Sequence, residues 1–139
     1  MPRHHPQHTA SGVLILLPEG GTGLAVAEAS LDRIGSDGRT GRERQAALEA
    51  DLARLRAGVL PNETELQDAP VLHDWRLVIR AGEPLPSLTG ILAGAHPHAT
   101  PGRRIVTSMV AALDIQNRHW ARTVSRFYVL GPPEGMRKS

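Results

Sequence analysis

The chain has 139 residues, a formal net charge of +2, an aromatic content of 3% and no cysteine. This length supports a single domain with a core of aliphatic side chains. The lack of cysteine excludes disulfides, thiolate zinc sites and cysteine nucleophiles, and no apolar run reaches the ~18 residues that a transmembrane helix needs. The apolar run at residues 12–18 is followed by no signal-peptide cleavage pattern, so a cytoplasmic protein is expected.

The charge is distributed unevenly along the chain. Residues 1–84 carry nine Arg against twelve Asp and Glu, whereas residues 85–139 carry six Arg and one Lys against two acidic residues. Such asymmetry indicates either an anionic partner, nucleic acid above all, or an acidic helix that neutralises a basic sheet within the same fold. Both interpretations stay open at the level of the sequence.

Residues 1–39 are predicted to form an N-terminal arm and linker, followed by one small domain at 40–139. Two apolar stretches, 12–18 and 23–29, flank a glycine-rich loop, which is typical of a β-hairpin. A phosphate-binding loop would need a Lys-Ser or Lys-Thr pair after the glycines, and Leu24-Ala25 stand there instead. We therefore expect a hairpin or a flexible arm rather than a nucleotide site.

The clearest single element is a helix that begins at Thr40. Thr40 and Glu43 form a capping-box pattern, in which each side chain satisfies a backbone amide at the helix start. A narrow apolar stripe follows at helical spacing, made of Leu48, Leu52, Leu55 and Val59. Asp51 and Arg54 are spaced for an ion pair, and Gly58 ends the helix after about four to five turns. The stripe predicts packing on a sheet, with partner binding through the same stripe as the alternative.

A second capping-box pattern, Asn62 with Glu65, predicts a short helical turn over 63–68. Residues 75–80 then fit either a strand or a continued helical turn. We interpret Trp75 as a core anchor between helix and sheet rather than as a platform for a ligand.

The last third of the chain is predicted to form a three-stranded antiparallel meander. Its strand candidates are residues 88–95, 105–113 and 119–129, which are rich in β-forming side chains. Pro101-Gly102 and Gln116-Asn117 mark the turns between them. The predicted fold is therefore α+β, with one amphipathic helix packed on this meander, which either stays open or curls toward a small barrel.

Period-two alternation sorts the side chains of the predicted strand 119–129 onto two faces. One face carries Trp120, Arg122, Val124, Arg126 and Tyr128, and the other carries Ala121, Thr123, Ser125, Phe127 and Val129. Guanidiniums that alternate with aromatic rings are typical of a platform for single-stranded nucleic acid, where bases stack on the rings. The alternative is a solvated sheet face on which the arginine stems lie over the rings. The predicted partner-binding set is Arg103, Arg104, Trp120, Arg122, Arg126 and Tyr128.

His96 and His98 would share one face of a strand, a spacing that suits metal ligation. A metal site needs further ligands and none stands out, so neither a metal nor a cofactor is expected. Serine, histidine and aspartate are available for hydrolysis, but no GxSxG nucleophile elbow orders them. A small hydrolase is thus the least favoured function, and no catalytic residue is assigned.

Several segments within residues 45–131 resemble one family of small bacterial domains of unknown function. The pattern runs from DLARLRAG at 51–58, through AP, L and DW at 69–75, to the closing WARTVSRFYVLG at 120–131. A Gly, His-Pro, Gly, Ile, Thr-Ser series at 94–108 also fits, with one extra residue before the His-Pro pair. The family pairs a helix with a meander and has no established activity, so the resemblance implies the fold and leaves the function open.

Two functions are favoured on this evidence. The first is a non-enzymatic interaction module that binds nucleic acid or another anionic partner through the basic face of the meander. The second is an adaptor or inhibitor from a mobile element that binds a protein through the helix stripe or a strand edge. A nucleic-acid or protein partner is expected in either case, with no membrane association.

Overall fold

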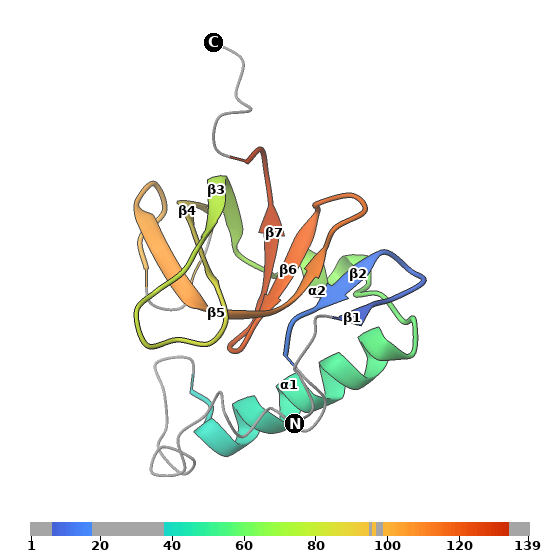
Figure 1. Ribbon diagram of the computed structural model, residues 1–139. Coiled ribbons are helices and arrows are strands. Elements are labelled where there is room, and N and C mark those ends of the chain that lie inside the picture. Colours follow the sequence, from blue (N-terminus) through green and yellow to red (C-terminus); the bar gives the residue numbers. More distant parts are fainter. Residues whose placement is uncertain (1–6, 18–37, 95, 97–98, 134–139) are drawn as a thin grey trace.

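The chain folds into a curled β-sheet with α1 lying across one side of it (Figure 1). The computed structural model describes residues 7–17, 38–94, 96 and 99–133. Among these residues lie the helices α1 (Gly41–Arg56) and α2 (Glu63–Gln67) and the strands β1 (Gln7–His8), β2 (Val13–Ile15), β3 (Val71–Val78), β4 (Ser87–Ala93), β5 (Arg104–Asp114), β6 (Trp120–Thr123) and β7 (Phe127–Leu130). The predicted α+β class is confirmed. In the described part of the chain, neither helix is long and apolar enough to cross a membrane.

Five of the strands close on themselves into a barrel-like sheet. They lie in the order β5-β4-β3-β7-β6, and β6 pairs again with β5. Neighbouring strands are antiparallel except β3 and β7, which run parallel where Leu72 lies opposite Leu130. An up-and-down chain with an odd number of strands brings its first and last strands together in the same direction, so the closing pair is parallel. The meander therefore curls toward a barrel, with more strands than predicted.

The prediction of one long strand over 119–129 is wrong, because a turn divides this segment into β6 and β7. Thr123 holds the turn. Its N–H donates to the Arg126 carbonyl at 2.9 Å, and its hydroxyl oxygen accepts from the N–H groups of Ser125 and Arg126 at 3.3 and 3.2 Å. Threonine hydroxyls stabilise turns through such local bonds. Side chains that were sorted onto one face of a single strand therefore lie on different faces of a hairpin.

The other strand predictions are close to the structure. β4 and β5 match the predicted strands 88–95 and 105–113, with ends that differ by one or two residues. For residues 75–80 the strand alternative is the correct one, although β3 begins earlier and ends at Val78. These strands are recognisable because their β-forming side chains lie between glycine and proline turn signals.

Trp75 is a core residue, as predicted, but it packs inside the barrel rather than under α1. Its side chain is 7% exposed and belongs to the cluster of hydrophobic side chains that fills the barrel. The indole N–H donates to the carbonyl oxygen of Gly131 at 2.7 Å. Gly90 of β4 lies directly opposite, where an added Cβ would come within 3.2 Å of the Trp75 Cβ. The lack of a side chain at Gly90 therefore allows β3 and β4 to pack closely here.

α1 begins as predicted. The Thr40 hydroxyl oxygen accepts from the Glu43 N–H and the Glu43 carboxylate accepts from the Thr40 N–H, each at 3.0 Å. Beyond the helix end, Gly58 has a φ of 87°, the left-handed conformation that commonly follows a helix. Three members of the predicted stripe are buried, namely Leu48, Leu52 and Leu55. Val59 lies past the helix end and is 54% exposed, so the stripe is shorter than predicted.

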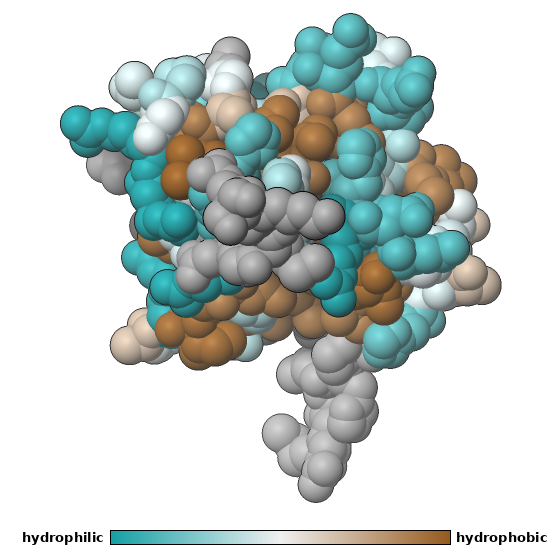
Figure 2. Space-filling model, turned by 90° about the horizontal axis from the view of Figure 1, so that it is seen from above, coloured by the Kyte–Doolittle hydropathy of each residue, from teal (hydrophilic) through white to brown (hydrophobic). Residues whose placement is uncertain are grey.

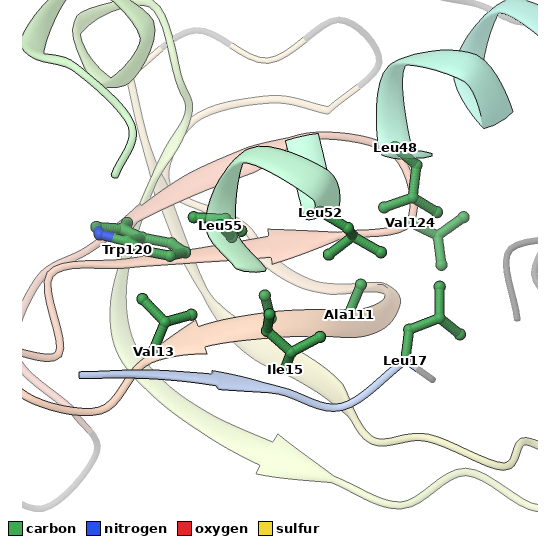
Figure 3. Close-up of a cluster of buried hydrophobic side chains, with 10 residues drawn as sticks. Val13, Ile15, Leu17, Leu48, Leu52, Leu55, Ala111, Trp120 and Val124 are labelled. Carbon is green, nitrogen blue, oxygen red and sulfur yellow. The ribbon is translucent and has the colours of Figure 1, made fainter. Parts of the chain in front are cut away.

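The buried leucines of α1 face β2, β5 and β6 (Figure 3). They form one hydrophobic cluster with Val13, Ile15, Leu17, Ala111, Ala112, Trp120 and Val124. A second cluster lies within the barrel and contains Leu72, Trp75, Leu88, Leu92, Val110, Leu113, Ala121, Tyr128 and Leu130. The barrel thus has a core of its own and shares another with α1, whose apolar stripe is used for packing on the sheet.

A hairpin is present near the N-terminus, between β1 and β2. β2 then pairs with β5, with Val13 opposite Asp114, and so extends the sheet beyond the barrel. Val13, Ile15 and Leu17 are buried beneath α1. The apolar stretch 23–29, predicted as the second arm of a hairpin, lies outside the described residues.

α2 is the short helical turn predicted over 63–68, and its capping box is complete. The Asn62 side-chain oxygen accepts from the Glu65 N–H at 2.8 Å, and the Glu65 carboxylate accepts from the Asn62 N–H at 3.3 Å. None of its residues is buried. Glu65 also lies 3.2 Å from Arg54, so α2 is joined to α1 by an ion pair.

Hydrophobic side chains also reach the surface outside the two clusters. Figure 2 shows hydrophobic residues among hydrophilic ones on the face opposite α1. Among the residues that the structure describes, the large exposed hydrophobic ones are Val59, Leu60, Leu77, Ile79, Val106 and Ile115. Val106 lies on β5 beside one of the cavities that form the candidate site.

Candidate functional site

The structure separates the residues that were predicted to form one partner-binding face. Trp120 and Tyr128 are each 4% exposed and belong to different clusters, Trp120 beside α1 and Tyr128 inside the barrel. Arg122 is 2% exposed. The prediction of one exposed platform is therefore wrong for these three side chains, because the turn at 124–126 folds β7 back along β6.

The other three members of the predicted set are at least partly accessible. Arg103 and Arg104 are exposed near the start of β5, and Arg126 is half-buried in the β6–β7 turn. The Arg104 guanidinium lies 3.5 Å from the carbonyl oxygen of Asp74. Arg126 lines two adjoining cavities, and the candidate site is built around it.

Arg122 is a structural residue that joins β6 to α1. Its Nε–H donates to Oδ2 of Asp51 at 2.8 Å, and an Nη1–H donates to the Thr123 carbonyl at 2.7 Å. The guanidinium carbon lies 5.4 Å from the centre of the Phe127 ring, a cation–π geometry. Burial lowers the pKa of Arg122, and the Asp51 carboxylate opposes that shift. Because arginine keeps its charge at neutral pH, Asp51 lies beside a buried positive charge.

Asp51 is shared between the buried Arg122 and the exposed Arg54. The predicted ion pair between Asp51 and Arg54 is confirmed. Its hydrogen bond and charge raise the pKa of Arg54. Since Arg54 also contacts Glu65, a chain of ion pairs ties β6, α1 and α2 together.

A cleft of about 560 Å³ opens where α1 and α2 meet the β6–β7 turn. Among the described residues that line it, the arginines are Arg39, Arg122 and Arg126, and the acidic residues are Asp51, Glu65 and Asp68. Arg39 immediately precedes the α1 cap, and its guanidinium donates to the Ser125 carbonyl at 2.7 Å. Two of the three carboxylates lie within the ion-pair chain of the helices. The side of the cleft formed by the β6–β7 turn therefore carries the guanidiniums of Arg39 and Arg126.

A second cavity, of about 350 Å³, lies beyond the turn. The two cavities share His96, Ser125 and Arg126. One wall of the second cavity is β5 from Ile105 to Ser108. Among the described residues that line it there is no Asp or Glu, and the arginine among them is Arg126.

Hydrogen bonds hold the walls of the second cavity in place. The hydroxyl oxygens of Ser108 and Ser125 lie 3.2 Å apart and bridge β5 to the turn. The Nε2 atom of His96 lies 2.9 Å from the Tyr128 hydroxyl. Burial raises the pKa of Tyr128, and the positive charge of Arg126 acts in the opposite direction. Arg126 and Tyr128 line the same cavity.

The groups that converge here are donors suited to an anion. Guanidiniums and hydroxyls bind carboxylate and phosphate oxygens through charge-assisted hydrogen bonds. The His96 ring meets the Tyr128 hydroxyl, and the Ser108 and Ser125 hydroxyls meet each other, so these contacts orient the cavity walls. In the described part of the chain, no group of three or more His, Asp or Glu side chains could hold a metal ion. His98, the second histidine of the predicted pair, lies outside that part.

Neither the position of Arg39 at the site nor the contact between Ser108 and Ser125 is predicted from the sequence. Arg39 is far from the β6–β7 turn in sequence, and nothing in its neighbourhood indicates that the two meet. The Thr123-x-Ser125 spacing was the available signal for the turn, because threonine and serine hydroxyls favour local backbone bonds. Once the turn is known, Ser125 and Arg126 are placed at a half-buried bend rather than in a strand.

A family model matches residues 45–135, which hold most of α1, all of α2 and the whole barrel. The match includes Arg126, Ser125 and the β5 wall, whereas Arg39 precedes it. Neither the curated proteins nor the solved structures contain a match to the chain. The predicted resemblance to a family without an established activity is confirmed. The chain belongs to DUF6634, a family of unknown function.

Proposed function

We propose that the domain is a non-enzymatic interaction module that binds an anionic group of its partner at the β6–β7 turn. The single observation that carries the proposal is the position of Arg126, which lines both cavities. An anion bound there would also meet the Ser125 side of the turn, against which Arg39 is held. Arginine is well suited to this role because its planar guanidinium binds a carboxylate or a phosphate in bidentate geometry.

The charge of the surroundings supports an anion at this place. The second cavity has no lining carboxylate among its described residues, so an anion near Arg126 would meet no negative charge from that wall. Arg103 and Arg104 lie near the start of β5, the strand that forms the wall. Positive charge that gathers around a concave site raises the local concentration of anionic ligands and their association rate.

The burial of two predicted binding surfaces bears on the two functions that the sequence favours. Leu48, Leu52 and Leu55 are buried against the sheet, so the α1 stripe is unsuited to bind a partner. Trp120 and Tyr128 are buried as well, which leaves base stacking on these rings without support. The function that the geometry favours is therefore the binding of an anionic partner through arginine side chains.

The test is a binding titration with two defined anionic probes, a fluorescein-labelled poly-glutamate peptide and a labelled oligodeoxythymidylate, followed by fluorescence anisotropy. Arg126→Gln removes the charge at the turn, and Arg80→Gln is the control because Arg80 is an exposed arginine that pairs with Glu83. At low salt we expect at least one probe to bind, with about tenfold weaker binding to Arg126→Gln and unchanged binding to the control.

The salt dependence of the affinity provides a second criterion. Loss of one phosphate contact should reduce the slope of log affinity against log salt by about one unit if the oligonucleotide is the ligand. Equal losses in Arg126→Gln and Arg80→Gln would show attraction to net charge alone and would contradict the proposal. Failure of both probes to bind the wild-type chain at low salt would contradict it as well.

A further inference from the structure

β5 has an edge that the barrel leaves uncovered. On one edge β5 pairs with β4, from Arg104 to Met109, and then with β2. On the other edge its strand partner is β6, whose register begins only at Val110. In the described structure, the N-terminal half of β5 therefore has a strand neighbour on one side only.

Hydrogen bonds at the start of β5 show which backbone groups face this open edge. Leu92 of β4 donates to the Arg103 carbonyl at 2.8 Å, so Arg103 faces β4. The Ile105 carbonyl faces the same way, because it accepts from the Thr89 hydroxyl at 2.9 Å. Positions alternate along an antiparallel ladder, so the N–H and C=O of Val106, which lies between Ile105 and Thr107, point away from β4. Val106 is also 51% exposed, which is consistent with an uncovered edge.

The open edge and the basic turn belong to one cavity. The second cavity is lined by β5 from Ile105 to Ser108 on one side and by Ser125 and Arg126 on the other. A chain lying along β5 would therefore pass the Arg126 guanidinium. Unpaired strand edges attract other strands, and proteins commonly use them to bind extended peptides.

We infer that an extended, acidic segment of a partner protein adds as a further strand to β5 along residues 104–108 and places a carboxylate on Arg126. This inference rests on the proposed function and names its ligand class. Backbone pairing supplies affinity that is independent of sequence, and Arg126 selects for an acidic side chain. A peptide fits better than a nucleic acid because the N–H and C=O of Val106 match a peptide backbone, whereas a sugar–phosphate chain offers no matching donor.

The test starts from an unbiased collection of peptides. A random library of short peptides displayed on phage is selected on the wild-type chain and counter-selected on Arg126→Gln. We expect enriched peptides to contain an acidic residue within a run of β-forming residues. Synthetic copies should bind Arg126→Gln about tenfold more weakly than the wild-type chain and should bind Arg80→Gln normally.

The second step tests strand addition itself. N-methylation of the selected peptide at each amide in turn should weaken binding about tenfold at every second position and leave the intervening positions unchanged. On the protein, Val106→Pro removes the N–H that faces the open edge, whereas Val106→Ala keeps it. We expect Val106→Pro to lose peptide binding and Val106→Ala to retain it, with circular dichroism as the check on folding. The N-methylation series gives the same information without altering the protein.

The outcomes separate this inference from the proposed function. An N-methylation profile without a period of two, or a lack of enrichment on the wild-type chain relative to Arg126→Gln, overturns strand addition by an acidic peptide. If no peptide binds but the oligodeoxythymidylate does so in an Arg126-dependent manner, the inference is wrong and the proposed function stands. If no probe depends on Arg126, both are wrong.

Discussion

The ion pair between Arg122 and Asp51 should make a large contribution to the stability of the fold. The Arg122 side chain is 2% exposed and that of Asp51 is 15% exposed, so Asp51→Asn would leave a nearly buried guanidinium without its counter-charge. Breaking a buried pair by removing one partner costs about 3–5 kcal/mol. Because water can reach the Asp51 side of the pair, we expect the lower end of that range, about 3 kcal/mol.

Urea denaturation followed by tryptophan fluorescence measures this loss, since Trp75 and Trp120 are both buried and report on the two hydrophobic clusters. With a denaturant slope of about 2 kcal/mol per molar urea, a loss of 3 kcal/mol lowers the midpoint by about 1.5 M. The double variant Asp51→Asn with Arg122→Met removes both charges. It should recover part of the loss, because an apolar side chain can replace the pair without an unpaired charge.

Arg54→Gln is the matched control for this experiment. It removes the other guanidinium that contacts Asp51, but Arg54 is 49% exposed, so the loss should stay below about 1 kcal/mol. If Asp51→Asn costs no more than Arg54→Gln, the contact between Arg122 and Asp51 behaves as a surface ion pair. That result would refute the reasoning from burial.

Three further predictions concern other parts of the fold. Tyr128 is the single tyrosine of the chain, so its tyrosinate absorbance during alkaline titration should give a pKa above the ordinary value of about 10. Because the pKa is raised, the protonated tyrosine contributes stability that is fully present below pH 10 and is lost as the pH rises through the folded-state pKa. The free energy of unfolding should therefore fall less steeply above pH 10 in Tyr128→Phe than in the wild-type chain. Thr123→Val should lower the free energy of unfolding in urea by about 1–3 kcal/mol because it removes the hydroxyl that holds the β6–β7 turn, whereas Thr123→Ser should retain most of it. Leu52→Ala should cost about 2–5 kcal/mol in the same assay and Val59→Ala less than about 0.5 kcal/mol, and equal losses would contradict the end of the stripe at Leu55.

The elements that could be predicted from the sequence are those whose signals are local. The Thr40 and Asn62 capping boxes lie within four consecutive residues, and both are present in the structure. The three leucines of α1 and the strands β4 and β5 follow patterns that are complete within one element. Such patterns predict structure correctly because the contacts on which they depend form within the element itself.

The features that could not be predicted depend on contacts between distant segments. Residues 124–126 contain no Gly, Pro or Asn, so the β6–β7 turn was hidden within a continuous strand-like pattern. The pairing of β2 with β5 and the contact of Arg39 with Ser125 join residues that are far apart in sequence. Arg122 appeared to be a surface residue for the same reason, since its partner Asp51 lies on α1.

The division of the predicted binding set follows from this missing turn. With β6 and β7 as separate strands, Trp120 and Tyr128 enter different hydrophobic clusters, and Arg126 moves from a strand face to a half-buried bend. Part of the charge asymmetry of the sequence is thus neutralised within the fold. Arg122 neutralises Asp51 on the helix. Arg126 lines both the cleft that holds Asp51, Glu65 and Asp68 and the second cavity, which has no lining carboxylate among its described residues.

The most direct test of an anion site at the β6–β7 turn is a map of backbone amide chemical shifts in the ¹⁵N-labelled chain during titration with the poly-glutamate peptide and, separately, with inorganic phosphate. We predict saturable shifts centred on Ser125 and Arg126 and on the β5 wall at 105–108, which surround the second cavity. These shifts should be absent in Arg126→Gln and present in Arg80→Gln. Shifts that centre elsewhere on the chain, or that persist unchanged in Arg126→Gln, would contradict the proposed site.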